Sequence, residues 1–170
     1  MWSRRRRVLA LLALAPVGAC GFRPVYGRRS DDAGLAADLR AIAVPNAQSQ
    51  LTFELRRALL DELNPTGTAT PSLYRLDYRL TRTGENLAIQ LDGIVTRVDR
   101  VLRAVYSLRD LQSDRTLHRG QVQRTASFNV RGEPFADRIA EEDADRRAAR
   151  ALAVAMRQQL VAFFERRETA

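Results

Sequence analysis

The sequence has few of the residues on which enzyme chemistry most often depends. It contains one cysteine, Cys20, one histidine, His118, and no lysine, so that all 28 basic residues are arginine. A single cysteine excludes an intramolecular disulfide and a CxxC metal site. The sequence also lacks a glycine-rich phosphate loop and the GxSxG and HExxH motifs. These absences argue against a disulfide-stapled fold, a nucleotide-binding enzyme and a zinc protease.

The N-terminus has the layout of a secretory signal. Four arginines precede an apolar stretch of twelve residues, Val8 to Ala19. A helix needs about 20 residues to cross a bilayer, so a permanent anchor is not expected. The small residues Gly18 and Ala19 lead directly into Cys20, as in a lipobox. We predict that residues 1–19 are a lipoprotein signal peptide and that Cys20 is lipidated; the alternatives are a plain secretory signal and a short membrane anchor.

Removal of the signal peptide changes the charge of the chain. The 151 mature residues keep 24 arginines against 20 acidic residues, a net charge of about +4 in place of +8. No basic stretch is interleaved with aromatic residues, so no nucleic-acid partner is predicted. Residues 20–37 are predicted to be a lipidated tether, because the stretch from Arg28 to Gly34 is too polar for a core. Residues 38–167 are predicted to form a single α/β domain.

The spacing of apolar residues changes along this domain from a helical period to strand alternation. The predicted elements are a strand at 39–44, a helix capped by Asn46 or Ser49 that ends at Asn64, strands at 73–91, 94–109 and 117–128, and a helix from Phe135 or Asp137 to Phe164. This β-α-β-β-β-α order predicts an α/β two-layer sandwich. Its sheet has about four strands, is mostly antiparallel, and carries two packed helices.

The first long strand contains one irregularity. Its apolar set changes parity between Leu80 and Leu87, so the segment Thr83–Asn86 must hold a bulge or a hairpin turn. The sequence leaves both open. We favour one long strand, bulged near Gly84, that turns back at Asp92–Gly93.

A catalytic or metal site is not evident. His118 lies near a predicted turn and has no identifiable partner to make it a general base. The acidic residues from Glu141 to Asp145 suit the start of a helix, where they complement its dipole, and they lack the spacing of a calcium loop. We therefore predict no metal, no cofactor and no enzymatic activity.

Several stretches resemble the alphaproteobacterial branch of the lipopolysaccharide (LPS) assembly lipoprotein family. They are Cys20–Gly27 (CGFRPVYG), Thr96–Arg97, Ala104–Asp110 (AVYSLRD), Ser127–Asn129, Pro134–Ala136 and Ala140–Ala148. The resemblance implies a plug-like partner in the lumen of the outer-membrane LPS translocon barrel, needed for barrel assembly and able to bind LPS. It also implies an outer-membrane lipoprotein that faces the periplasm, and Gly21 in place of Asp argues, by enterobacterial sorting rules, against retention in the inner membrane.

Arginines of two neighbouring strands are candidates for contact with the phosphates and carboxylates of LPS. Guanidinium groups bind such anions in a bidentate manner. The candidate residues are Arg75, Arg79, Arg97, Arg100 and Arg103. The alternative is a solvated sheet face whose charge is balanced by Asp77 and Asp99. Two other functions stay open: an accessory lipoprotein of another envelope transport system, and a lipid-anchored envelope hydrolase.

Overall fold

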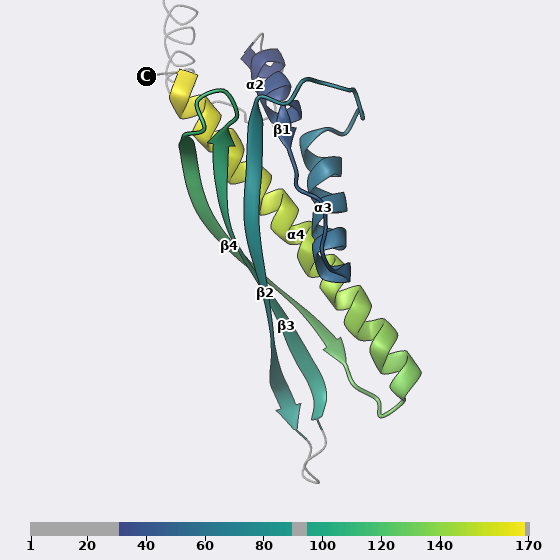
Figure 1. Ribbon diagram of the computed structural model, residues 1–170. Coiled ribbons are helices and arrows are strands. Elements are labelled where there is room, and N and C mark those ends of the chain that lie inside the picture. The colour runs from purple at the N-terminus through teal and green to yellow at the C-terminus, as the bar shows by residue number, and fades with distance from the viewer. Residues whose placement is uncertain (1–30, 90–94, 169–170) are drawn as a thin grey trace, which may run out of the picture. The chain divides into compact units, whose positions relative to one another are not determined.

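The computed structural model describes residues 31–89 and 95–168 (Figure 1). The elements are α2 (Asp31–Arg40), β1 (Ile42–Ala43), α3 (Gln50–Leu63), β2 (Tyr74–Ile89), β3 (Val95–Asp110), β4 (Thr116–Asn129) and α4 (Pro134–Glu168). The four strands form one sheet in the order β1-β2-β3-β4. β1 pairs with β2 in parallel, and the other neighbours are antiparallel. The predicted α/β sandwich and its meander are confirmed, with a third helix, α2, added.

The segment before α3 differs from the prediction. A strand was expected at 39–44, but residues 31–40 form α2, and only Ile42 and Ala43 are in a strand. Leu35 and Leu39 lie one helical turn apart and pack on the core, with Leu39 only 4% exposed. Residues 31–37 of the predicted tether are therefore helical. Residues 20–30, Cys20 among them, lie outside the described residues.

Helix α3 forms as its sequence predicts. Its N-cap is Ser49, whose Oγ accepts a hydrogen bond from the Thr52 N–H at 3.3 Å, and the Thr52 hydroxyl oxygen in turn accepts from the Ser49 N–H at 2.9 Å. This reciprocal capping box satisfies donors that the first turn leaves free. Leu55, Leu59 and Leu63 form the buried stripe of the helix.

β2 and β3 pair with each other from Tyr74 to Ile89 as one long antiparallel ribbon. Their register is constant from the pair Tyr74–Asp110 to the pair Asn86–Val98, and the irregularity lies between Asn86 and Ile89. The hairpin alternative at Thr83–Asn86 is therefore wrong, and the bulge lies a few residues beyond Gly84. The predicted turn at residues 92–93 lies outside the described part of the chain.

One face of the sheet holds the core. Even-numbered side chains of β2 and β3 point to the helices, and residues such as Leu76, Leu102 and Leu108 are completely buried. They meet the apolar side of α4, where Leu152 and Met156 are also fully buried. Figure 1 shows α4 crossing behind the strands. Among residues 31–89 and 95–168, no helix is long and apolar enough to span a bilayer.

Candidate functional site: the open sheet face

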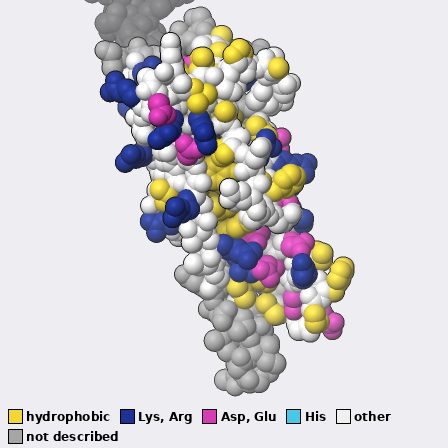
Figure 2. Space-filling model, in the orientation of Figure 1, with side chains coloured by type: hydrophobic (Ala, Val, Ile, Leu, Met, Phe, Trp, Pro, Cys, Tyr) yellow, Lys and Arg dark blue, Asp and Glu magenta, His cyan; other side chains and the backbone are white. Residues whose placement is uncertain are grey.

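The second face of the sheet is covered by none of the elements that the structure describes. We call it the open face, and it consists of the odd-numbered side chains of β2, β3 and β4 from Arg75 to Thr83, from Arg97 to Arg109 and from Arg119 to Ser127. Side chains alternate across a strand, so the inward set of the core defines this outward set. Basic side chains gather over the upper part of the strands in Figure 2.

Four of the five candidate arginines lie together on the open face. They are Arg75, Arg79, Arg97 and Arg103, and all four are exposed. The register places Arg103 beside Thr81 of β2, one step along from the Arg79–Val105 pair. The structure therefore brings four of the five candidate arginines to one exposed face of the sheet.

The arginines of the open face differ in how they are paired. Arg75 forms an ion pair with Asp77 at 2.9 Å, and Arg103 donates a hydrogen bond to the Gln121 side chain at 2.7 Å. Arg79 and Arg97 have no hydrogen bond or ion pair to any described residue. Within the described residues, Arg79 and Arg97 can therefore bind a ligand without breaking an existing contact.

The predicted balance by two aspartates holds for one of them. Asp77 contacts Arg75 and also approaches Arg109, with 4.0 Å between the Arg109 Nε and a carboxylate oxygen. Asp99 instead accepts a hydrogen bond from the Ser127 hydroxyl at 2.5 Å. Charge compensation is therefore concentrated at one end of the face.

Arg100 does not belong to this face. It is even-numbered, so its side chain points to the helices, where it is 14% exposed and lies 2.6 Å from Glu141. Its Nε is 3.6 Å from Asp145, and its guanidinium lies over the Phe128 ring at 5.6 Å. Arg100 joins the sheet to α4, and its place in the candidate set was a misassignment of the strand parity.

Two further arginines of the open face were absent from the predicted set. Arg109 is the cross-strand partner of Arg75, and Arg119 is the partner of Ser107 on β4. Alternation along β3 points to Arg109, but Arg119 could be added only once the β3–β4 register was known. The described open face thus carries six arginines and two aspartates. A surface of this composition suits a ligand with several phosphates or carboxylates.

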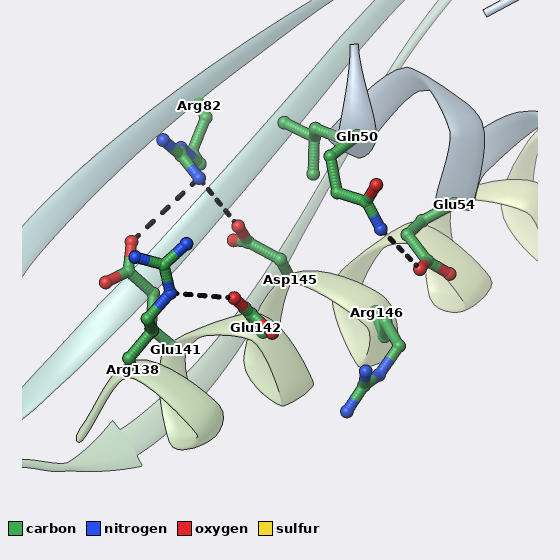
Figure 3. A pocket seen from close by; sticks show the side chains of 9 residues that line it. Gln50, Glu54, Arg82, Arg138, Glu141, Glu142, Asp145 and Arg146 are labelled. Carbon is green, nitrogen blue, oxygen red and sulfur yellow. Dashed lines mark hydrogen bonds and ion pairs between the residues drawn. The ribbon is translucent and has the colours of Figure 1, made fainter. Parts of the chain in front are cut away.

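A cavity of about 370 Å³ lies between α3, β2 and the first turns of α4 (Figure 3). Most of its charged groups are paired with one another, but Glu54 accepts a hydrogen bond from the Gln50 amide and Arg146 pairs with Asp143 outside the cavity. Arg82 binds Asp145 at 2.7 Å, and Arg138 binds Glu142 at 3.2 Å. No group of three or more metal-ligating side chains occurs in the described residues. The predicted acidic segment of α4 therefore contributes two residues that hold sheet arginines, namely Glu141 and Asp145.

His118 lies on β4 and faces α4. Its ring stacks on Phe163 at 5.1 Å between centroids, and its Nε2 is buried with no hydrogen-bond partner among the described residues. Burial lowers the pKa of His118, with a smaller contribution from the charge of Arg166. The carboxylate that a general base would use as its partner is missing from its described surroundings.

Comparison with known proteins gives structural matches only. No protein-family model matches the chain, and no curated protein matches it in sequence. A predicted lipoprotein from Caulobacter crescentus shares the fold at a TM-score of 0.65 and 21% identity, covering 77% of this chain and 96% of its own. A minor lipoprotein from Acinetobacter baumannii matches at a TM-score of 0.52 and 18% identity, covering 71% and 88%. The chain therefore has a fold that occurs in bacterial lipoproteins.

Proposed function

We propose that this chain is an outer-membrane lipoprotein of LPS assembly. It is anchored through a lipid on Cys20, faces the periplasm, and acts as the plug and assembly partner of the LPS translocon barrel. The proposal is supported by the sequence resemblance that begins at Cys20 and by a fold shared with bacterial lipoproteins. The observation that carries it furthest is the open face, a basic surface that no described element covers, on a domain whose core lies between the sheet and the helices.

A domain of this kind suits the interior of a barrel. The lumen of a large outer-membrane barrel is polar and lined with water. The described domain buries a continuous apolar core between its own sheet and helices, so this core needs no partner. The arginines of the open face are directed outward. A plug in a water-lined lumen needs a self-contained core and a wet surface, and both are present.

LPS is the anionic ligand expected at the open face. Its phosphates and carboxylates are acceptors that guanidinium groups bind well. The strands space the side chains of Arg79 and Arg97, which have no partner among the described residues, along a rigid surface, and this limits the entropy lost when a large ligand binds.

Partner capture tests the assembly role. Tagged full-length protein, processed by the cell, is purified from membranes in mild detergent and the proteins that accompany it are identified. We expect one large outer-membrane barrel in nearly equal amount. Recovery of an inner-membrane transport complex would favour an accessory of another envelope system, and recovery of neither would contradict the proposal.

LPS binding is tested by changing charge on one face at a time. The triple variant R79Q/R97Q/R103Q removes three positive charges from the open face. The control variant R57Q/R138Q/R150Q removes three exposed charges from the helix layer. We expect the first variant to bind LPS vesicles at least several-fold more weakly and the second to bind like the parent. An equal loss of LPS binding in both variants would mean that binding depends only on the net charge of the protein.

A further inference from the structure

Two exposed leucines lie side by side at one end of the sheet. Leu73 precedes β2 and Leu111 follows β3, and their side chains are 55% and 49% exposed. The Leu111 N–H donates to the Leu73 carbonyl at 2.9 Å, which fixes the two residues as neighbours. Both extend the odd-numbered set of β2 and β3, so they form an apolar edge to the open face.

Two arginines lie one step inward from the leucines. Arg75 and Arg109 are directly opposite each other on β2 and β3, an arrangement in which like charges repel. They share Asp77 at 2.9 and 4.0 Å, and Arg109 also contacts Asp114 at 3.1 Å. The Arg75 and Arg109 side chains remain 56% and 44% exposed. Each can therefore take a further anionic partner.

This end of the domain is also the end at which the chain enters it. The Leu73 N–H donates to the carbonyl of Ala41, the residue between α2 and β1, at 2.9 Å. Asp31, the first residue of α2, is eleven residues after Cys20, and such a segment spans at most about 40 Å.

The far end of the domain lies well away from these leucines. Helix α4 runs about 40 Å from Phe164, which contacts Tyr74, to Phe135.

Apolar side chains at the rim with cations one step behind them are the arrangement expected of a surface that binds a membrane interface. Apolar side chains at the rim enter the boundary between headgroups and acyl chains, and arginines one step behind reach lipid phosphates. Anionic headgroups attract each such cation, and the attraction falls within a Debye length of the surface. A protein partner would not explain why the apolar rim coincides with the end at which the chain enters the domain.

We propose that, before a barrel takes up the lipoprotein, this end of the domain rests on an anionic membrane surface. Leu73 and Leu111 insert, and Arg75 and Arg109 contact headgroup phosphates. The proposal rests on the proposed function only for the lipid anchor that brings this end to the membrane. The contact orients the domain on the bilayer, so that its long axis stands away from the surface.

A single tryptophan tests this orientation. The only tryptophan of the sequence, Trp2, lies in the predicted signal peptide, so the mature chain offers a clean background. Residues 21–170 with the substitution L111W are attached through an N-terminal histidine tag to vesicles that contain a nickel-chelating lipid. Phosphatidylcholine vesicles with and without phosphatidylglycerol are compared, and lipids with brominated acyl chains quench a tryptophan that enters the bilayer.

We expect L111W to shift its emission to the blue and to lose most of it to brominated lipid, more strongly when phosphatidylglycerol is present. The matched controls are V105W in the middle of the open face and F135W at the far end, whose native side chains are 50% and 79% exposed. Both should remain unquenched. Equal quenching at all three positions, or none at Leu111, would overturn the proposal.

Two additional measurements test the remaining alternative explanations. Protection of L111W from aqueous iodide without quenching by brominated lipid would show that the chain's own N-terminal residues cover the leucines, and would also overturn the proposal. Vesicle flotation of L73D/L111D against V105D repeats the test without an aromatic reporter, and circular dichroism checks that each variant folds. Because the tag replaces the lipid and no barrel or LPS is present, failure here leaves the LPS-assembly function untouched.

Discussion

Tyr106 of β3 lies across Gly120 of β4, and its ring fills the space that a side chain at position 120 would need. A Cβ atom at Gly120 would come within 2.5 Å of the ring carbon Cζ. From this position the Tyr106 hydroxyl donates to the Gln159 side chain on α4 at 2.7 Å. The ring is 2% exposed, and burial raises the pKa of Tyr106 to about 12. Gly120 thus allows one side chain to connect β3 and β4 to the long helix.

The substitution G120A should destabilise the protein. A methyl group cannot share the space of the Tyr106 ring, and overpacking of this kind costs about 1–3 kcal/mol. The same change at an unobstructed strand position would be favourable by about 0.5–1 kcal/mol. Urea denaturation of G120A, Y106L and the double variant measures the coupling. We expect the double variant to be less destabilised than the sum of the single ones; strict additivity would show that the two residues do not compete for space.

The pair formed by Asp145 and Arg82 should contribute more to stability than pairs on the helix surface. Asp145 is 8% exposed and also lies 3.6 Å from Arg100. The substitution D145N leaves two sheet cations with less compensation, at an expected loss of about 1.5–3 kcal/mol. The control E142Q removes an exposed pair with Arg138 and should cost less than about 0.5 kcal/mol. Equal denaturation midpoints for the two variants would contradict this assignment.

His118 should make the protein less stable in mild acid. Its pKa is lowered in the folded state, so at pH values near and below about 6.5 the unfolded chain binds the proton more readily. Stability is therefore complete above that pH and declines as the pH falls toward the lower folded-state pKa. Because the sequence has one histidine, a single imidazole resonance reports its titration in NMR. A midpoint above 6.5, or an H118F variant with the same pH profile of stability, would exclude this effect.

Much of the fold could be predicted because its elements follow simple periods. The stripe of Leu55, Leu59 and Leu63 predicts α3, and alternation predicts the three long strands. Helix α2 was missed because its first residues are polar and its packing depends on two leucines, Leu35 and Leu39. A helix stabilised mainly by tertiary contact leaves little local pattern in the sequence.

The position of the bulge could not be predicted for a related reason. Arg82 continues the helix-facing side of β2 in regular register and pairs with Asp145, 63 residues later in the chain. A charged residue on the inner face interrupts the apolar alternation from which a strand slip is located. Arg100 was placed among the ligand-binding candidates for a similar reason, because its partners on α4, Glu141 and Asp145, are far away in sequence. Charges on a buried face can be assigned only when their long-range partners are known.

Arg100 and Arg103 should therefore behave differently although they are three residues apart on one strand. R100Q removes a guanidinium that lies 2.6 Å from Glu141 and is 14% exposed, so it should cost about 1.5–3 kcal/mol of stability. R103Q changes an exposed residue whose contact is a hydrogen bond to Gln121, and should alter stability by less than about 0.5 kcal/mol. LPS binding should show the reverse order, with R103Q weakened and folded R100Q unchanged. If R100Q were fully stable but lost LPS binding, Arg100 would have to reach the open face, and the division of the sheet into a structural and a ligand-binding side would be wrong.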